Sequence, residues 1–516
     1  MGAGIAQLAC LAGADTLLHD PVPEALERGQ EQIKRHLERG AERGRWSVED
    51  ARAAASRLQA VARLEDLAGA ELVIEAAPER LELKRDLFAR LSEDIVSEQC
   101  VLATNTSSLL VTAIARGINR PERVVGMHFF NPAPLMRLLE VVAGAQSCPE
   151  ALAVARAAGE AMGKVVIDAV DGPGFLVNRC NRPFGLEALK LLQERIAGVE
   201  EIDRICRLEG GFRMGPFELS DLVGVDVGLD VARSFYEQSF GEPRWRPSSI
   251  PVKAVAAGRT GRKSGRGYYD YSGGTDSYRP PDPEPLPIGG GDGVVVVAGS
   301  SPLAMDLRDA AGMAGWDVAE PEEAGDRQPP SLILDVTGGE APEAPLEGGP
   351  QAICCSAGSL AALDPGGSAV GFHALPPLSG ADLVELTKGP DSAASAADAA
   401  ERFFATLGKR TAWVADAPGL LLGRMVCQVI NEAAFALGEG VGTGRDIDAG
   451  MIYGLNYPRG PLAWADEIGL DHVVAVLDGL YDELHEERYR VAPSLRRLVL
   501  SGRLGRQTGE GFFRYD

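Results

Sequence analysis

An internal repeat constrains the fold of this chain more than any other feature of its sequence. Motifs in the first half recur in the second half at a nearly constant offset of about 245 positions. One offset shared by many motifs indicates a duplicated unit rather than the short period of a solenoid. The matching pairs are Gly126-Met127-His128 with Gly371-Phe372-His373, Glu140 with Glu385, Asp171 with Asp416, Ile202-Asp203 with Ile447-Asp448, and Gly224 with Gly469.

Each copy divides into an α/β part and a helical part. In the α/β part, short apolar runs alternate with helical patterns such as 79–95, which favours parallel βαβ pairing with helices on both faces of a sheet. The second part has apolar residues at helical spacing, for example over 174–192 and 420–437. We therefore predict an α/β Rossmann domain followed by an all-α domain, with this pair duplicated. The strands predicted for the first copy are 16–19, 72–75, 100–104 and 124–127.

A segment rich in proline and glycine joins the two copies. It reads SGGTDSYRPPDPEPLPIGGGDG and has no apolar period, which is typical of a linker. The sequence thus predicts five parts, the fourth of which is a degenerate version of the first. They are a Rossmann domain over 1–169, a helical domain over 170–272, a linker over 273–293, a degenerate Rossmann-like domain over 294–415 and a second helical domain over 416–516.

Composition and charge exclude several classes of protein. The chain has 51 Lys and Arg against 74 Asp and Glu, and this net charge of -23 disfavours general nucleic-acid binding. No apolar run reaches the roughly 18 residues needed to cross a bilayer, and the first residues do not resemble a secretory signal. The eight cysteines show no CxxC spacing, so we expect reduced thiols, no metal site and a cytoplasmic location.

The first residues match the end of a glycine-rich phosphate-binding turn. In a Rossmann fold the pattern G-x-G-x-x-G follows the first strand and opens a helix, and its glycines let the backbone approach a pyrophosphate. Only Gly2, taken as the third glycine, is present, whereas a strand over 294–297 and a turn precede the matching Ala304. We therefore expect that the sequence lacks its first strand and the start of this turn. The alternative is that Met-Gly-Ala-Gly simply begins a helix.

Asp20 indicates which dinucleotide the first copy would bind. It follows the predicted strand 16–19, where a carboxylate accepts a hydrogen bond from a ribose 2′-hydroxyl and repels a 2′-phosphate. NAD is therefore favoured over NADP. In isolation, such a residue is more often an aspartate that caps a turn at the end of a strand.

Four motifs of the first copy occur together. They read ATNTSSL over 103–109, GMHFFNP over 126–132, LLEVV over 138–142 and DGPGFLVNR over 171–179. Jointly they resemble the L-3-hydroxyacyl-CoA dehydrogenases, and the duplication is similar to the long enzymes of the 3-hydroxybutyryl- or 3-hydroxyadipyl-CoA type. The resemblance covers 1–271 and, in weaker form, the second copy. It implies NAD-dependent oxidation of an L-3-hydroxyacyl-CoA to the 3-oxoacyl-CoA, in fatty acid β-oxidation or in phenylacetate-type aromatic-acid catabolism.

A histidine and a glutamate carry the expected chemistry. Oxidation of a secondary alcohol needs a base for the hydroxyl proton while hydride leaves the carbon, and histidine is the usual base near neutral pH. His128 follows an apolar strand, and Glu140 can orient its ring and stabilise its charged form. The resemblance makes His128 the base and Glu140 its partner. The alternatives are a strand-end histidine bonded to backbone and a glutamate on a solvated face.

Further site residues come from the resemblance. It implies that Ser107 and Asn178 bond the substrate oxygen and the histidine, although a serine here also suits a helix N-cap and Asn178 a helix surface. It places Gly2, Asp20 and Asn105 at the cofactor, Glu79 near the nicotinamide end, and Lys84 near the cofactor or the CoA. The alternative for Glu79 and Lys84 is an ordinary ion pair on an exposed helix.

The second copy keeps the pair but not its surroundings. His373 and Glu385 preserve the spacing, yet Gly423 replaces Asn178, and Ser301 and Ala304 stand where the turn needs glycines. A side chain at the close-approach glycine blocks the backbone from a pyrophosphate. We therefore expect that this copy does not bind NAD, and that its helical domain makes an intrachain pseudo-dimer or the chain forms a homodimer. On this hypothesis His373→Ala leaves turnover almost unchanged.

Three functions remain open at this point. The first is an NAD-dependent hydroxyacyl-CoA dehydrogenase. The second is another Rossmann hydroxyacid dehydrogenase with a lysine as its acid or base, against which the histidine–glutamate pair argues. The third is a non-catalytic binding or scaffold protein, which the incomplete turn and the degenerate second copy allow.

Overall fold

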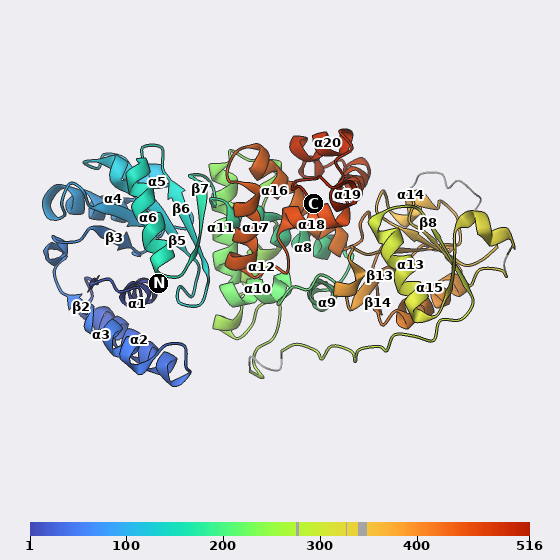
Figure 1. Cartoon of the computed structure of the whole chain (residues 1–516), viewed down its shortest axis with the longest axis horizontal. Helices are drawn as coiled ribbons and strands as arrows, with labels where there is room; N and C mark the ends of the chain where they lie inside the picture. The colour runs from blue at the N-terminus through green and yellow to red at the C-terminus, as the bar shows by residue number, and fades with distance from the viewer. Residues whose placement is uncertain (275–277, 327, 339–347, 516) are drawn as a thin grey trace. The chain divides into compact units, whose positions relative to one another are not determined.

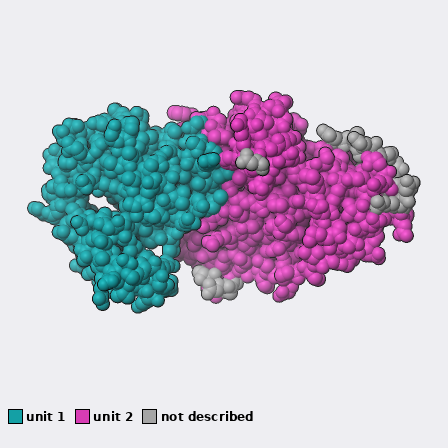
Figure 2. Space-filling model, viewed as in Figure 1, with its two compact units in different colours: residues 1–179, 440–455 teal, residues 180–439, 456–516 magenta. Residues whose placement is uncertain are grey.

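A computed structural model describes residues 1–274, 278–326, 328–338 and 348–515. The chain forms two compact units, which are coloured separately in Figure 2. Unit 1 comprises residues 1–179 and 440–455, and unit 2 comprises residues 180–439 and 456–516. Residues 440–455 belong to the second copy by sequence, so the units do not coincide with the two copies.

The sheet of unit 1 has five strands in the order β3-β4-β5-β6-β7, and all neighbours are parallel except β5 and β6 (Figure 1). A separate parallel pair is formed by β1 and β2. The apolar runs of β4 and β5 are buried on both faces, as expected for central strands between helices. The strands are β1 (Thr16–His19), β2 (Leu58–Val61), β3 (Leu72–Glu75), β4 (Val101–Thr104), β5 (Val124–Phe129), β6 (Leu138–Ala143) and β7 (Val165–Val170).

Helices cover this sheet and its neighbouring pair. Residues of α1 and α6 share one apolar core with β4, β5 and β6, whereas α2 and α3 pack with another part of α1. The helices of unit 1 are α1 (Gly2–Leu11), α2 (Pro23–Glu42), α3 (Val48–Ser56), α4 (Leu81–Arg90), α5 (Val111–Ala115), α6 (Pro149–Ala161), the start of α7 (Val177–Cys180) and α17 (Gly444–Leu455).

Unit 2 contains a second sheet with seven strands in the order β14-β13-β12-β11-β10-β8-β9. Here β8 lies between β10 and β9, whereas β3 and β1, at the matching positions of the first copy, lie in separate sheets. The strands are β8 (Val294–Ala298), β9 (Asp317–Ala319), β10 (Leu332–Asp335), β11 (Gln351–Cys354), β12 (Val370–His373), β13 (Leu383–Lys388) and β14 (Arg410–Trp413).

The remaining helices of unit 2 form the helical domains and flank the second sheet. Within the helical part, α16 packs against α8, α18, α19 and α20. The helices are α8 (Arg182–Glu194), α9 (Val199–Leu208), α10 (Pro216–Val223), α11 (Val225–Gln238), α12 (Ile250–Ala256), α13 (Pro302–Ala314), α14 (Leu360–Leu363), α15 (Ala394–Thr406), α16 (Leu422–Gly438), α18 (Pro461–Ile468), α19 (Leu470–Leu484) and α20 (Pro493–Leu500).

The predicted fold class and strands are confirmed with small changes at the ends. Strands 16–19 and 72–75 have the predicted bounds, β4 begins one residue later than predicted, and β5 runs on to Phe129. The predicted helix 79–95 is α4 followed by one turn of π-helix (Leu91–Ile95). None of the helices that the structure describes is long and apolar enough to span a membrane.

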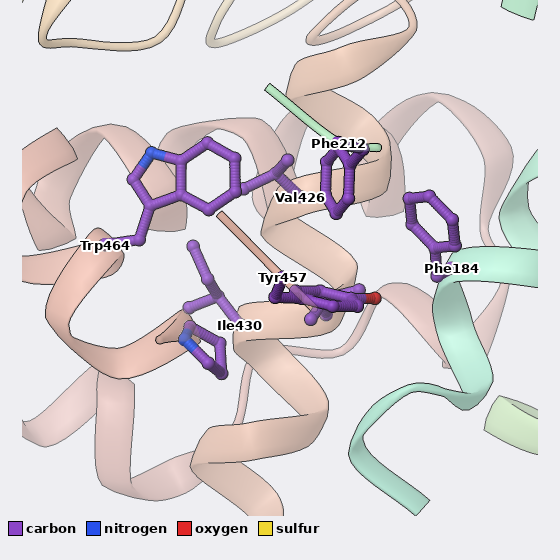
Figure 3. Close-up of a pocket in the computed structure, with 8 residues that line it drawn as sticks. Phe184, Phe212, Val426, Ile430, Tyr457 and Trp464 are labelled. Carbon is purple, nitrogen blue, oxygen red and sulfur yellow. The ribbon is translucent and has the colours of Figure 1, made fainter. Parts of the chain in front are cut away.

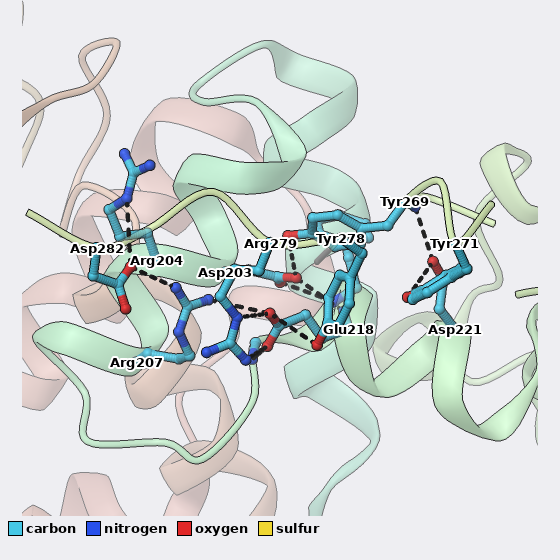
Figure 4. Close-up of polar contacts among 12 residues, drawn as sticks. Asp203, Arg204, Arg207, Glu218, Asp221, Tyr269, Tyr271, Tyr278, Arg279 and Asp282 are labelled. Carbon is cyan, nitrogen blue, oxygen red and sulfur yellow. Dashed lines mark hydrogen bonds and ion pairs between the residues drawn. The ribbon is translucent and has the colours of Figure 1, made fainter. Parts of the chain in front are cut away.

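The linker is anchored to the first helical domain at its start (Figure 4). Arg279 donates two hydrogen bonds to the buried Glu218, at 2.6 and 2.9 Å, and Asp282 accepts one from Arg207 at 2.8 Å. Residues 275–277 of the predicted linker lie outside the described residues. Charged side chains, together with the ring of Tyr278 packed against Tyr269 and Tyr271, therefore hold the start of this segment.

The duplication also appears in the hydrogen bonds that close each helical domain. Asp221 accepts from the backbone N–H groups of Tyr268 and Tyr269, at 3.0 and 2.9 Å. Asp466 accepts in the same way from Phe512 and Phe513, at 2.8 and 2.9 Å. The matched carboxylates thus hold the ends of the two copies alike.

Between helices α8, α16 and α18 of unit 2 lies a small apolar pocket (Figure 3). The Tyr457 hydroxyl donates a hydrogen bond to Asn181 at 2.8 Å, so its polar end is satisfied. The lining is almost entirely apolar. It consists of Phe184, Phe212, Val426, Val429, Ile430, Tyr457, Pro461 and Trp464.

Candidate active site

His128 and Glu140 form a buried pair on adjacent antiparallel strands of unit 1. The register of β5 and β6 places the two residues directly opposite each other. His128 Nδ1 lies 2.6 Å from Glu140 Oε2, and the two residues are 5% and 0% exposed. The alternatives of a backbone-bonded histidine and a solvated glutamate are therefore wrong. His128 also lies within the strand, because β5 continues past it.

The buried charge of Glu140 is satisfied by backbone as well as by the imidazole. Its Oε1 accepts hydrogen bonds from the N–H groups of Leu176 and Val177, at 3.2 and 2.9 Å. A buried carboxylate is tolerated only when such donors replace water. Glu140 is therefore held as an acceptor, and its other oxygen, Oε2, accepts a hydrogen bond from the N–H at His128 Nδ1.

This arrangement leaves His128 Nε2 as the basic nitrogen. When Nδ1–H donates to a carboxylate, the neutral ring carries its lone pair on Nε2. The rings of Phe130 and Phe175 lie 4.7 and 5.7 Å from the imidazole, centroid to centroid, and limit its rotation. Among the described residues, none accepts from or donates to Nε2. The ring is thus oriented and free to take a proton from a bound alcohol.

The loop after β4 is held next to the pair by side-chain hydrogen bonds. Asn105 Oδ1 accepts from the backbone N–H of Phe129, at 2.8 Å, so this loop is fixed to the residue after His128. Glu79 Oε1 accepts from the Thr106 hydroxyl at 2.5 Å and from the Ser107 N–H at 3.0 Å. Burial alone would raise the pKa of Glu79, but the Thr106 hydrogen bond and the Lys84 charge outweigh it and hold that pKa below its usual range.

Lys84 lies beneath this loop rather than on an exposed helix. The residue is 1% exposed, and its Nζ lies 2.7 Å from Glu75 Oε1 and 3.3 Å from Glu79 Oε2. Thr104, at the end of β4, donates to the other oxygen of Glu75 at 2.7 Å. The ion pair expected as the alternative therefore forms, but its lysine is buried rather than exposed on the helix. Sequence reasoning missed Glu75, although its position at the end of an apolar strand was a usable signal.

Ser107 and Asn178 are the accessible members of the predicted catalytic set, whereas His128 and Glu140 are buried. Ser107 is exposed, and α5 starts four residues later, with Leu110 as its N-cap, so the serine does not cap that helix. Asn178 lies in the short helix α7 next to Val177 and is partly exposed. Its side chain forms no hydrogen bond with another residue of the described ranges.

The start of α1 and the end of β1 fit an NAD molecule. Helix α1 begins at Gly2, where an added Cβ would make a single contact, 3.7 Å from that of Ala76. Asp20 follows β1 and is partly exposed. Its Oδ1 accepts from the Val22 N–H at 2.9 Å, the turn-capping role expected as the alternative, which leaves Oδ2 for a hydroxyl. A helix start and a strand-end carboxylate are the donor and acceptor that a dinucleotide requires.

The corresponding positions of the second copy are filled by protein groups. Ser301 caps α13 by accepting from the Ala304 N–H at 3.2 Å. Arg308 donates to the Gly299 carbonyl at 2.6 Å and pairs with Glu320, the residue after β9, at 2.8 Å. Glu320 therefore occupies the place of Asp20 but is neutralised by an arginine of its own domain.

The second histidine and glutamate are at the same register but do not pair. His373 and Glu385 face each other on β12 and β13. His373 Nε2 instead lies 3.1 Å from Nε2 of His472 on α19, and its Nδ1 has no partner among the described residues. Burial, with the charge of His472, holds the pKa of His373 well below its usual range.

Glu385 keeps its backbone donors but exchanges histidine for another carboxyl group. It accepts from the N–H groups of Leu421 and Leu422, at 2.9 and 2.7 Å, as Glu140 does from its own pair. Its neighbour is Glu209, which follows α9. Burial raises the pKa of Glu385 to about 8, and burial together with the charge of Glu385 raises the pKa of Glu209 well above its usual range.

These features define an NAD-binding oxidoreductase with one complete histidine–glutamate pair, and the comparisons with known proteins agree. The family model "3-hydroxyacyl-CoA dehydrogenase, NAD binding domain" matches residues 1–172. The model of the C-terminal domain of that family matches residues 174–271 and again 419–515.

Relatives and solved structures extend this match over the whole chain. It is 36% identical over 501 residues to the 3-hydroxyadipyl-CoA dehydrogenase of Escherichia coli K12, covering 97% of this chain and 95% of the relative. The probable 3-hydroxybutyryl-CoA dehydrogenase of Bacillus subtilis is 39% identical over 52% of this chain and 94% of its own. The crystal structure of 3-hydroxybutyryl-CoA dehydrogenase from E. coli K12 matches with a TM-score of 0.81, 34% identity and 97% coverage of both chains.

The chain therefore belongs to the 3-hydroxyacyl-CoA dehydrogenase family. It is an NAD-dependent oxidoreductase of that family, as the sequence motifs predicted. The same matches argue against the Rossmann hydroxyacid dehydrogenase with a lysine acid or base and against the non-catalytic scaffold.

Proposed function

We propose that the first copy oxidises a short L-3-hydroxyacyl-CoA, of the 3-hydroxybutyryl- or 3-hydroxyadipyl-CoA type, to the 3-oxoacyl-CoA. The observation that carries this proposal is the buried His128–Glu140 pair, whose Nε2 is free to accept a proton. The names of the relatives support the substrate class, since they include both a hydroxyadipyl- and several hydroxybutyryl-CoA dehydrogenases.

His128 would act as the base. Its Nε2 takes the proton of the substrate hydroxyl, and Glu140 stabilises the positive ring through the 2.6 Å contact at Nδ1. Ser107 and Asn178 would bond the substrate oxygen and the imidazole, which their accessible side chains allow. NAD, when bound, supplies the acceptor for the hydride that leaves the same carbon.

Five residues would hold the cofactor, and they would do so in two ways. Gly2 would allow close approach of the pyrophosphate to the start of α1, and Asp20 would accept from a ribose hydroxyl. Asn105 and Glu79 would fix the loop beside the nicotinamide, as their hydrogen bonds to Phe129 and Ser107 support. Lys84 would act through Glu79 because it is buried beneath it.

We further propose that the second copy does not bind NAD, since Arg308 already satisfies Glu320 and Ser301 already caps α13. The bounds of the five predicted parts, and an intrachain pseudo-dimer or homodimer, belong to the same proposal. A cytoplasmic location is supported by the eight cysteines, none of which forms a disulfide bond in the described part of the chain.

An absorbance assay of NADH formation tests the substrate and the cofactor together. We expect the chain to turn over 3-hydroxybutyryl-CoA and 3-hydroxyadipyl-CoA with NAD, and to use free 3-hydroxybutyrate or NADP at least about a hundredfold less efficiently. The ratio of kcat/KM for the two thioesters then identifies the preferred acyl group. Equal use of the free acid would contradict an acyl-CoA substrate.

A further inference from the structure

We propose that α17, a helix of the second helical domain, positions the His128–Glu140 pair of the first copy, and that Gly450 and Gly454 are the positioning residues. The proposal rests on the proposed function of that pair. Helix α17 lies within unit 1, apart in sequence from everything else there. The second copy would thus contribute a helix to the site of the first.

Two matched hydrogen bonds show that each copy bonds the other just before one helix of a helical domain, which is α9 in the first copy and α17 in the second. The N–H of Val170, at the end of β7, donates to the carbonyl of Val441, just before α17, at 3.3 Å. The N–H of Ala415, which follows β14, donates to the carbonyl of Ile196, before α9, at 2.9 Å. Both residues of one bond lie about 245 positions from those of the other. Within each unit, a segment of one copy's helical domain therefore packs beside the sheet of the other copy.

Two glycines let α17 approach the site closely. A Cβ on Gly450 would lie 2.6 Å from Cγ2 of Val177, and a Cβ on Gly454 would lie 2.6 Å from Cδ2 of Leu138 and 3.4 Å from the Phe130 ring. Real Cβ atoms do not approach other atoms to 2.6 Å, so the neighbours would have to move. Glycine is thus required for this packing, not for an unusual backbone angle.

The three neighbours of α17 are parts of the support of the pair. Val177 donates its N–H to Glu140 at 2.9 Å, and Leu138 precedes Glu140 by two residues on the same face of β6. Phe130 lies 4.7 Å from the imidazole of His128. A helix that presses on these groups fixes both members of the pair.

The matching helix of the first copy lacks the glycines. Ile205 and Glu209 stand where the second copy has Gly450 and Gly454. Glu209 is the carboxyl group that meets Glu385 in unit 2. The glycines therefore belong to the helix near His128 and Glu140, which contact each other. The bulkier residues belong to the helix near His373 and Glu385, which do not.

The test uses Gly450→Ala in the full chain, with Gly312→Ala as its matched control. Gly312 is also helical, and an added Cβ there meets nothing within 4 Å. We expect Gly450→Ala to lower kcat about tenfold with the KM for NAD unchanged, because moving the Val177 N–H weakens its bond to a charged oxygen. The acid limb of kcat/KM should move to higher pH, since a less satisfied Glu140 favours the charged imidazole.

A proton NMR signal provides a readout that does not depend on turnover. The His128 Nδ1 proton, assigned by its loss in His128→Asn, should shift in Gly450→Ala but not in Gly312→Ala. Val177→Ala added to Gly450→Ala removes the crowding methyl groups and should restore the signal and most of kcat. A Gly450→Ala chain with unchanged signal and pH profile, or one that only melts earlier, would overturn the proposal. Failure of the wild-type chain to oxidise acyl-CoA would instead refute the proposed function and leave the signal comparison valid.

Discussion

The two copies place the same histidine and glutamate opposite each other on equivalent strands, but the side chains contact different partners. In the first copy, His128 and Glu140 bond each other, and one imidazole nitrogen stays free. In the second, His373 meets His472 and Glu385 lies beside Glu209. The backbone donors to the glutamate survive in both. The comparison teaches that the strand register is a structural feature of the fold, whereas catalysis depends on the partners around it.

The largest expected difference between the copies comes from the carboxylates. Glu140→Gln keeps the shape of the pair but removes the charge that stabilises the protonated ring, so kcat should fall by about 10³–10⁴-fold. Glu385→Gln should leave kcat within about twofold, because no base depends on it. Steady-state rates of the two purified variants measure this. Similar losses in both would remove the distinction between the copies.

The nucleotide positions should differ by a smaller factor. Asp20→Ala should raise the KM for NAD by about 10–100-fold, since a hydrogen bond to a charged group is worth about 1.5–3 kcal/mol. Glu320→Ala, the same change in the second copy, should not alter that KM because Arg308 already pairs with Glu320. Initial rates over a range of NAD concentrations test both. A rise in KM for Glu320→Ala would mean that the second copy binds the cofactor.

The buried carboxyl group of Glu385, beside Glu209, predicts that the stability of unit 2 depends on pH. The folded-state pKa of Glu385, about 8, lies above its unfolded value of about 4.3, so its stabilising contribution is complete below pH 4.3. That contribution is lost as the pH rises through about 8. We expect the free energy of unfolding to fall over this window, by up to about 5 kcal/mol.

Glu209→Gln provides the control for that pH dependence. The amide can donate to Glu385 at any pH, so this variant should lose less stability between pH 6 and pH 9 than the wild type. Urea unfolding followed by tryptophan fluorescence measures it. An unchanged pH slope in the variant would show that the two carboxyl groups are not coupled.

The smallest effect is expected at Arg308. Its ion pair with Glu320 is partly exposed, so Arg308→Ala should cost about 1 kcal/mol or less in the free energy of unfolding. Calorimetric titration should still give one NAD per chain, because Ser301 continues to cap α13. A second bound NAD in this variant would show that Arg308 alone prevents the second copy from binding NAD.

The sequence predicted much of the fold because local patterns determine its elements. Alternation of apolar runs and helical periods gave the strands 16–19 and 72–75 with their bounds. The pair His128–Glu140 was predictable because residue types in a recognisable motif carry it. In contrast, the burial of Lys84 was not predictable, because it depends on the packing of α4 against the end of β3, which no local pattern shows.

The partners of the second copy were beyond sequence reasoning for a related reason. His373 and His472 are far apart in the chain, and only the packing of α19 over the second sheet brings them together. Likewise, the glycines of α17 look ordinary in a helix until the exchange between copies places them against Val177 and Leu138. Long-range packing that follows from duplication leaves no periodic pattern to read.

The most direct test of the central claim is the turnover of two full-length variants, His128→Ala and His373→Ala, with 3-hydroxybutyryl-CoA and NAD. Circular dichroism first confirms that each variant is folded. We expect His128→Ala to lose activity by at least about 10³-fold, as removal of a catalytic base does, while His373→Ala stays within about twofold of the wild type. Loss of turnover in a folded His373→Ala chain, or its survival in His128→Ala, would contradict the assignment of catalysis to the first copy alone.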